Sequence, residues 1–217
     1  MGCIRPENLT RTQGSPTKPI IGLAGGIGAG KSSVARVFQT LGAAVIDFDR
    51  LTHEQLRHPE VVTKLRRWWG DGICTAAGEV DHQAVASIVF DDPAQLSRLE
   101  GLLYPRLDRR RVELVAAYER DPAVDAVVLD AAKLYEAGLG ELCNAVVFVE
   151  VERALRLQRL VETRGWTDAE LTRRENLQDA LDKKRYLADY VVVNHSDIDH
   201  LRPQVERVFS SVLASFS

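Results

Sequence analysis

Residues 25–32 read Gly-Gly-Ile-Gly-Ala-Gly-Lys-Ser, which fits the pattern G-x-x-x-x-G-K-S of a phosphate-binding loop, or P-loop. The short apolar segment 20–24 precedes this loop. Apolar residues at helical spacing (Val34, Val37, Phe38 and Leu41) follow it and stop at Gly42. Strand, glycine-rich loop and helix in this order form the context in which such a loop binds phosphate. The sequence therefore predicts that the chain binds a nucleoside triphosphate.

Each part of the loop has an expected role. Glycines allow backbone N–H groups to wrap around a phosphate, and the N-terminus of the next helix adds the positive end of its dipole. We expect Lys31 to reach the outer phosphates and the Ser32 hydroxyl to ligate Mg²⁺. The expected nucleotide-binding residues are Gly25, Gly26, Ile27, Gly28, Ala29, Gly30, Lys31, Ser32 and Ser33.

The composition is that of one α/β domain. The 217 residues are 45% apolar and 27% charged, with a formal net charge of −3, and they suffice to bury a core. This charge argues against a nucleic-acid surface as the main function, and no apolar run approaches the length of about 18 residues typical of a membrane helix. Cys3, Cys74 and Cys143 are widely spaced and odd in number, which is typical of free thiols. We therefore expect a cytoplasmic protein with neither a membrane nor a nucleic-acid partner.

Strand-like and helical patterns alternate along the chain. Apolar strands are predicted at residues 43–47, 124–130, 145–151 and 190–194, and helical patterns fill 51–121, 153–185 and 199–216. Within the long helix that begins at Asp92-Pro93, we expect Arg109, Arg110 and Arg111 to belong to a solvated face. The alternation predicts an α/β fold, a doubly wound parallel sheet of the P-loop NTPase type with an inserted helical substrate domain and a helical lid.

The expected organisation has one tail and one domain. Residues 1–18 are polar, lack the apolar segment of a signal peptide, and are expected to form a disordered tail. Residues 19–217 form the domain. Its core is expected at 19–50, 122–152 and 188–217, its helical acceptor subdomain at 51–121, and its lid at 153–187.

Three aspartates are predicted to lie at the edge of the sheet that carries the P-loop. Asp47 and Asp49 close the second strand, where residues two apart point the same way, so both carboxylates are expected to face the cleft. One of them can accept the proton of an acceptor hydroxyl or hold Mg²⁺, with Asp49 preferred for catalysis, while the alternative for Asp47 is a helix cap. Asp130 ends a buried strand in the position of a Walker-B carboxylate, which predicts a ligand for Mg²⁺.

The segment 153–185 is rich in cations, and arginine matches phosphate with a planar, always charged fork. A cationic helical segment between two buried strands is typical of a lid that closes on ATP. The guanine-reading pattern N-K-x-D is absent from the sequence, which favours a kinase over a GTPase. The cations are Arg156, Arg159, Arg164, Arg173, Arg174, Lys183, Lys184 and Arg185.

Several of these segments together resemble the dephospho-CoA kinase family. Residues 21–32 are similar to that family's I-G-L-T-G-G-I-G-S-G-K-S/T, residues 45–49 to V-I-D-A-D, and residues 88–93 to I-V-F-S-D-P. Residues 129–139 resemble D-x-P-L-L-F-E-x-G-L. The similarity covers roughly residues 20–209 and ends with Arg174, Gln178, Lys184, Ala188-Asp189-Tyr190-Val191 and Asn194 at the family's spacing.

The resemblance implies a function and specific roles. The family transfers the γ-phosphoryl group of ATP to the ribose 3′-hydroxyl of dephospho-CoA, the last step of CoA synthesis. By this resemblance Asp49 matches the catalytic base, residues 26–32 the phosphate cradle, and Arg159 with Arg164 the lid arginines.

The sequence departs from the family pattern outside the phosphate loop. Five family residues, two of them prolines, are replaced by Ala132, Lys133, Tyr104, His82 and Ala180. Lys133 stands where the family has a leucine, so it contacts an acceptor phosphate, or simply faces solvent, or destabilises the fold as an unpaired ammonium. Two alternatives to dephospho-CoA kinase follow, namely a kinase of the same fold with another nucleotide or nucleoside acceptor, and a catalytically idle nucleotide-binding protein. Retained Lys31, Ser32 and Asp49 argue against the idle protein.

Overall fold

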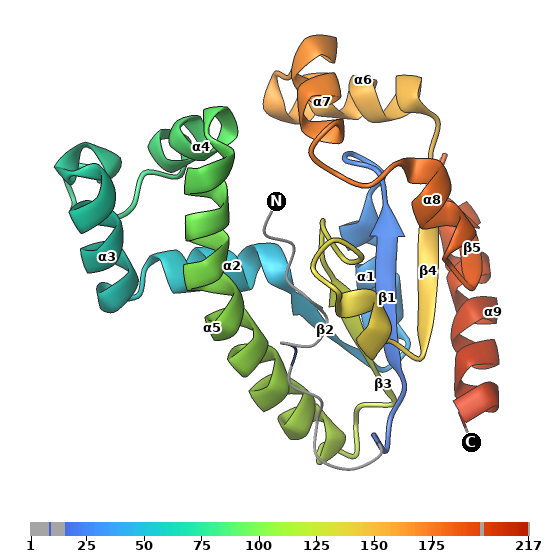
Figure 1. The fold of residues 1–217 in the computed structure, drawn as a ribbon. Coiled ribbons are helices and arrows are strands. Elements are labelled where there is room, and N and C mark those ends of the chain that lie inside the picture. Colours follow the sequence, from blue (N-terminus) through green and yellow to red (C-terminus); the bar gives the residue numbers. More distant parts are fainter. Residues whose placement is uncertain (1–8, 10–15, 196–197, 217) are drawn as a thin grey trace.

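In the described part of the chain, five parallel strands form one central sheet (Figure 1). The structure is a computed structural model that describes Leu9 and residues 16–195 and 198–216. The strand order is β2-β3-β1-β4-β5, which confirms the predicted doubly wound parallel sheet. The strands are β1 (Ile20–Gly25), β2 (Ala43–Asp47), β3 (Ala126–Asp130), β4 (Ala145–Glu150) and β5 (Tyr190–Val193).

The sheet is buried on both faces because successive side chains of a strand point in opposite directions. Ile21 and Leu23 of β1 pack into one core with the helices α1 (Lys31–Thr40) and α9 (Ile198–Phe216). Phe38 of α1 and Phe209 of α9 meet there edge to face, with ring centroids 5.7 Å apart. Ile20 and Ala24 belong to the core on the opposite face. This two-sided burial explains why the strands read as continuous apolar runs.

A helical excursion connects β2 to its neighbour β3. It comprises α2 (Phe48–Leu56), α3 (Pro59–Trp69), the 3₁₀ turn η2 (Asp71–Ile73), α4 (His82–Asp91) and α5 (Pro93–Glu119). Aspartate side chains cap three of these helices: Asp47 for α2, Asp81 for α4 and Asp92 for α5. Figure 1 shows α3 and α4 standing away from the sheet while α5 runs along its flank.

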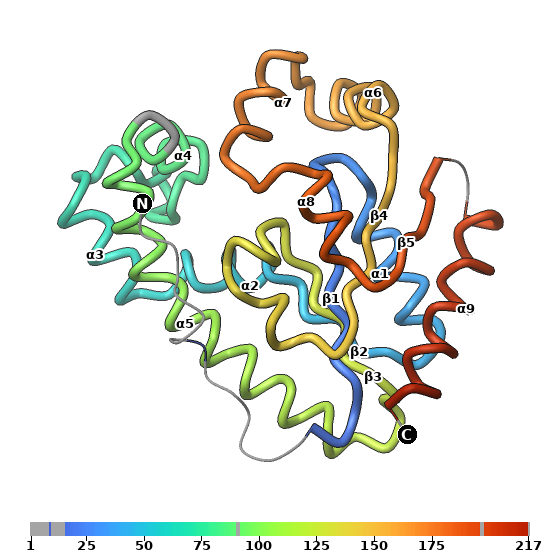
Figure 2. The backbone as a smooth tube through the Cα atoms, turned by 45° about the vertical axis from the view of Figure 1, so that its right-hand side comes forward, coloured from blue at the N-terminus to red at the C-terminus, as the bar shows by residue number. Residues whose placement is uncertain are grey.

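A second group of helices lies between β4 and β5. It consists of α6 (Arg153–Arg164), α7 (Asp168–Glu175) and α8 (Leu181–Tyr186). α6 ends at Gly165, whose φ of +65° favours glycine, and the Thr167 side chain caps α7. In Figures 1 and 2, α6 and α7 lie beyond the carboxyl end of β1, opposite α4. None of the helices in the described ranges is long and apolar enough to cross a membrane.

Two expectations about local structure are wrong. Asp49 does not extend the second strand, because β2 ends at Asp47 and Asp49 lies in the first turn of α2. Arg111 does not lie on a solvated face: it is 1% exposed and forms an ion pair of 2.7 Å with Asp108 inside the molecule. Residues 1–8 and 10–15 of the expected tail lie outside the described residues, while Leu9 packs against the core and Lys18 donates to the Tyr118 carbonyl at 2.9 Å.

Candidate active site

The P-loop connects the central strand directly to a helix N-terminus. β1 ends at Gly25, and α1 begins at Lys31. Gly28 and Gly30 both have φ of +79°, a conformation that glycine adopts without strain. The sharp course of the loop therefore depends on these glycines, and it brings residues 25–33 together as the sequence predicts. Because the open N-terminus of α1 adjoins the loop, the arrangement suits an anion.

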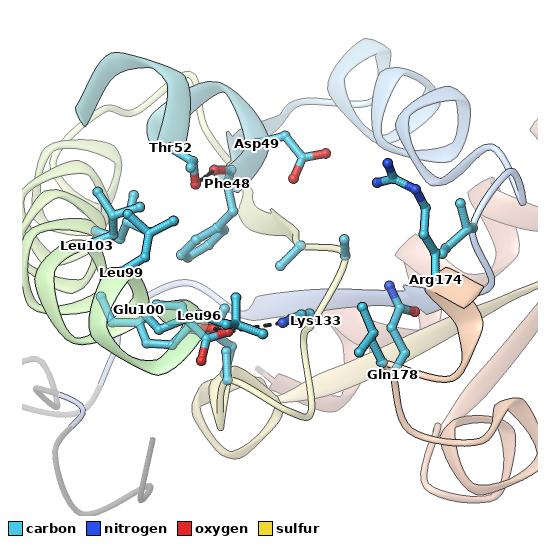
Figure 3. Close-up of a pocket in the computed structure, with 18 of the residues that line it drawn as sticks. Phe48, Asp49, Thr52, Leu96, Leu99, Glu100, Leu103, Lys133, Arg174 and Gln178 are labelled. Carbon is cyan, nitrogen blue, oxygen red and sulfur yellow. Dashed lines mark hydrogen bonds and ion pairs between the residues drawn. The ribbon is translucent and has the colours of Figure 1, made fainter. Parts of the chain in front are cut away.

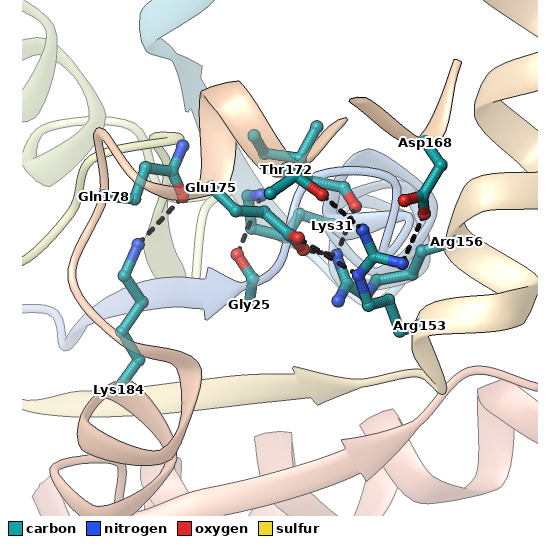
Figure 4. Close-up of polar contacts among 10 residues, drawn as sticks. Gly25, Lys31, Arg153, Arg156, Asp168, Thr172, Glu175, Gln178 and Lys184 are labelled. Carbon is teal, nitrogen blue, oxygen red and sulfur yellow. Dashed lines mark hydrogen bonds and ion pairs between the residues drawn. The ribbon is translucent and has the colours of Figure 1, made fainter. Parts of the chain in front are cut away.

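Arg156 of α6 covers the loop from the lid side. It is 2% exposed, and its Nη1 donates to the Ile27 carbonyl at 3.0 Å and to Oε1 of Glu175 at 2.6 Å (Figure 4). A Cβ on Gly26 would stand 2.7 Å from Nη1 of Arg156. A side chain at position 26 would therefore have to displace this guanidinium from its two hydrogen bonds. Arg156 has a positioning role that the cationic composition of the segment alone did not reveal.

Two buried or half-buried lysines lie near the loop. Lys31 Nζ is 3.5 Å from the Gly25 carbonyl. Burial lowers the pKa of Lys31, an effect that the nearby Asp130 opposes and Lys184 reinforces. Lys184 is 2% exposed and bridges Glu136 at 2.7 Å and Gln178 at 3.1 Å. Bound phosphates would offset the unfavourable burial of positive charge at Lys31.

Ser32 and Asp130 meet at the carboxyl edge of the sheet. The Ser32 hydroxyl donates to Oδ2 of Asp130 at 2.9 Å. Burial raises the pKa of Asp130, while Lys31 and the Ser32 hydrogen bond act in the opposite direction. A hydroxyl and a carboxylate side by side are hard oxygen ligands that fit Mg²⁺, which is commonly held by one or two protein groups plus substrate phosphates. The described residues contain no cluster of three or more His, Cys, Asp or Glu suited to hold a metal.

Asp47 and Asp49 have different environments. The Asp47 carboxylate accepts from the backbone N–H of Arg50 at 2.9 Å, as expected of a helix cap. Asp49 instead lines a cavity of about 390 Å³ that also includes Ile27 of the P-loop (Figure 3). The two carboxylates have different surroundings because α2 begins between them, at Phe48. Asp49 is therefore the one placed to meet an acceptor in the cavity.

The cavity has an apolar wall and a cationic wall. Leu96, Leu99 and Leu103 of α5 form the apolar wall together with Phe48. The opposite side carries lid residues, with Arg174 labelled in Figure 3. A large pocket that is mostly apolar with a few polar groups is typical of a small-molecule site. Its lid-side lining consists of Arg164, Trp166, Arg174, Leu177 and Gln178.

The two predicted lid arginines occupy different places. Arg164 lines the cavity and lies over the ring of Trp166, 5.2 Å from its centroid, while Arg174 lies 4.2 Å from the same ring. Arg159 does not line this cavity: its Nη2 donates to the Asn194 carbonyl at 2.9 Å. The Asn194 side chain donates to the Ala29 carbonyl at 2.8 Å, so Arg159 lies near the P-loop. Trp166 was not predicted as a site residue from the sequence. The only signal that could have indicated it is that it is an aromatic residue within a cationic segment.

Two departures from the family pattern converge in the cavity. Lys133 and Tyr104 both donate to Oε1 of Glu100, at 3.0 and 2.9 Å. Lys133 is therefore not an unpaired ammonium, and that alternative from the sequence is wrong. His82 lies elsewhere, 4.5 Å from the ring of His53, and burial lowers the pKa of His82 with His53 adding to the effect.

These features together define a P-loop kinase. The P-loop has its lysine and serine, β3 ends in a carboxylate, and a cavity lies between the start of α2, which carries Asp49, and a lid that carries arginines. Residues 19–200 match the sequence model of the dephospho-CoA kinase family, and the chain belongs to that family.

Individual relatives agree with this assignment. The chain is similar to the dephospho-CoA kinase of Deinococcus radiodurans, with 36% identity over 88% of this chain and 92% of the relative. It is also 36% identical to that of Symbiobacterium thermophilum, over 86% of this chain and 78% of the relative. Among solved structures, a Thermus thermophilus protein superposes with a TM-score of 0.74 and 28% identity, covering 92% of this chain and 98% of that one.

Proposed function

We propose that the chain transfers the γ-phosphoryl group of ATP to the ribose 3′-hydroxyl of dephospho-CoA, the last step of CoA synthesis. The single observation that carries this proposal is the position of Asp49, in a cavity that reaches the P-loop and has room for a small-molecule acceptor. Membership of the dephospho-CoA kinase family supports the same reaction.

The donor phosphates are assigned to residues 25–33. Lys31 supplies a positive charge for the outer phosphates, and the N–H groups of the loop bind their oxygens. Ser32 and Asp130 would hold Mg²⁺, which neutralises charge on the transferred group. The 2.9 Å contact between these two side chains supports the assignment, because both can reach one small cation.

Asp49 is assigned as the group that accepts the proton of the acceptor hydroxyl. Arg164 and Arg159 are assigned to stabilise negative charge, Arg164 from the cavity side and Arg159 from the side of the P-loop. Phosphoryl transfer depends mainly on positioning and charge neutralisation, so the contribution of each group is electrostatic or geometric.

The domain organisation follows from these roles. Residues 51–121 form the acceptor subdomain and residues 153–187 the lid, while residues 19–50, 122–152 and 188–217 form the core. CoA synthesis from ATP is consistent with a cytoplasmic location. The Arg156 contacts to Ile27 and Glu175 support a lid whose position is coupled to the P-loop.

A coupled assay of ADP formation tests the proposal. Purified protein is given ATP and Mg²⁺ with dephospho-CoA, and separately with AMP, CMP or a plain nucleoside. Turnover that requires dephospho-CoA, with product phosphorylated at the ribose 3′ position, is expected. Preferred phosphorylation of another nucleotide would establish a kinase of different specificity, and ATP binding without turnover would establish an idle nucleotide-binding protein.

A further inference from the structure

A polar group with an unusual composition is embedded in the apolar wall of the cavity. It consists of Glu100 and Tyr104 from α5 and Lys133 from the loop after β3 (Figure 3). Tyr104 and Lys133 are far apart in the sequence, and both depart from the residues usual in the family. Because both residues contact Glu100, the two departures from the family pattern change the same part of the cavity wall.

The ion pair is unsuited to bind the diphosphate of the acceptor. Lys133 is 33% exposed and Glu100 21%, with 3.0 Å between Nζ and Oε1. Because the carboxylate neutralises the ammonium, the pair carries no net charge. Arg164 on the opposite wall presents a planar guanidinium group that matches phosphate oxygens better, whereas Arg174 beside it is paired with Glu170 at 2.5 Å. Charge complementarity therefore places the diphosphate on the lid side.

The adenine base of the acceptor matches the remaining wall. A base has apolar faces, which the leucines of α5 and Phe48 can cover, and a polar edge, which needs both a donor and an acceptor. Lys133 Nζ offers a donor. Lys133 and Tyr104 both donate to Oε1 of Glu100, and an ionised carboxylate can accept about four hydrogen bonds, so Glu100 can accept a further one. The pair thus presents a donor beside an acceptor, the arrangement with which an amide side chain reads adenine.

We propose that Glu100 and Lys133 determine specificity by reading the adenine edge of the acceptor, with Glu100 accepting from the 6-amino group and Lys133 donating to the ring nitrogen N1. This inference rests on the proposed function and refines it. Tyr104 is a positioning residue, since its hydroxyl holds Oε1 of Glu100 at 2.9 Å.

The pair has a discriminating consequence. Replacing adenine by hypoxanthine turns the amino donor into a carbonyl acceptor and protonates the adjacent ring nitrogen. Glu100 would then face an oxygen and Lys133 an N–H group, so both interactions would be lost. A site built to hydrogen-bond a substrate group rejects an analogue without it far more strongly than a purely apolar site does.

The test compares kcat/KM for dephospho-CoA with kcat/KM for its hypoxanthine analogue. We expect the wild type to prefer adenine at least tenfold, and Glu100→Leu and Lys133→Met, which remove the acceptor and the donor, each to bring that ratio close to one while the KM for ATP is unchanged. Lys64→Met, on an exposed position of α3, is the matched control and should keep the wild-type ratio.

A purely structural role for the pair gives a different result. If Lys133→Met lowers the melting temperature while the adenine-to-hypoxanthine ratio stays at its wild-type value, the inference is overturned and the proposed function stands. If the wild type does not phosphorylate dephospho-CoA at all, both are overturned. Melting curves of each variant, recorded without ligand, establish that the compared proteins are folded.

Discussion

The Ser32 hydroxyl donates a 2.9 Å hydrogen bond to Oδ2 of Asp130, a residue 98 positions later in the chain. This contact connects the first turn of α1 with the carboxyl end of β3. It means that the serine of the P-loop and the aspartate at the adjacent strand end share one small volume. This proximity supports the proposal that the two side chains hold one divalent cation together.

Lys31→Ala is expected to lower kcat by about 100-fold or more, because it removes a charge that stabilises the transferred phosphoryl group. It should not lower the melting temperature. Burial lowers the pKa of Lys31, which means that burying its charged ammonium group makes folding less favourable. Steady-state kinetics and thermal unfolding of the ligand-free protein check both parts. Retained turnover above a few per cent would contradict the assignment.

Asp49→Asn is expected to lower kcat by about 10²–10⁴-fold with smaller effects on either KM, since the amide keeps the shape but cannot accept a proton. Asp47→Asn is the matched control. Asparagine caps helices about as well as aspartate, so this variant should keep both activity and stability. If the control loses turnover and Asp49→Asn does not, the roles of the two aspartates are reversed.

Asp130→Asn is expected to lower kcat by about 100-fold, because a metal ligand is weakened, yet to raise the melting temperature at neutral pH. Burial raises the pKa of Asp130 above its ordinary 3.8, so the native state keeps the proton to higher pH than the unfolded chain does. The contribution of Asp130 to the free energy of unfolding therefore falls as the pH rises from its ordinary pKa, that of the unfolded chain, through its raised pKa in the folded protein. Melting temperatures of the two proteins should agree at acid pH and diverge above it; equal curves throughout would contradict the assigned direction.

Arg164→Ala and Arg159→Ala are expected to differ in which substrate they affect. Arg164 lines the acceptor cavity, so its loss should act on the acceptor KM and on kcat. Arg159 lies near the P-loop through Asn194, so its loss should act on the ATP KM and on kcat. Initial rates with each substrate varied in turn separate the two effects. Identical changes in both variants would show that the lid acts as one unit.

Cys143 is expected to resist alkylation at pH 8 while Cys74 reacts. Burial raises the pKa of the Cys143 thiol to about 12, which leaves almost no thiolate, the reactive form. Cys74 is half-buried and contacts Arg66 Nε at 3.3 Å. Iodoacetamide treatment of the native protein followed by peptide mass spectrometry compares the two sites. Equal modification rates in the native protein would show that the environment of Cys143 opens readily.

The sheet, the P-loop and the strand-end aspartate could be predicted from local patterns. An apolar run, glycines at fixed spacing and a terminal carboxylate are consecutive in the sequence, as in residues 20–32 and at Asp130. Asp49 was predicted from its place after the second strand and the lid from the cationic segment 153–185, and the family resemblance then singled out Arg159 and Arg164 as lid arginines. These predictions concern either short segments or positions at the same edge of one sheet.

Side-chain partners across the fold could not be predicted in the same way. Arg111 follows two other arginines, and the sequence does not show that the i,i+3 pair it forms with Asp108 is buried. Lys133 looked unpaired because Glu100 lies on another element. The prediction that Asp47 and Asp49 point the same way, as alternate residues of one strand, was wrong because α2 begins between them. The Asp47 side chain caps α2 and so marks the end of the strand.

The strand order has a consequence for biosynthesis. β1 pairs with β3 and β4 and not with β2, so Ile20 finds its partner in Val127. The ribosome synthesises β1 first, so β1 cannot pair in the sheet until β3 and β4 have been synthesised. A nascent or truncated chain that stops within α5 therefore contains the whole P-loop motif but neither neighbour of β1 nor the carboxylate of Asp130.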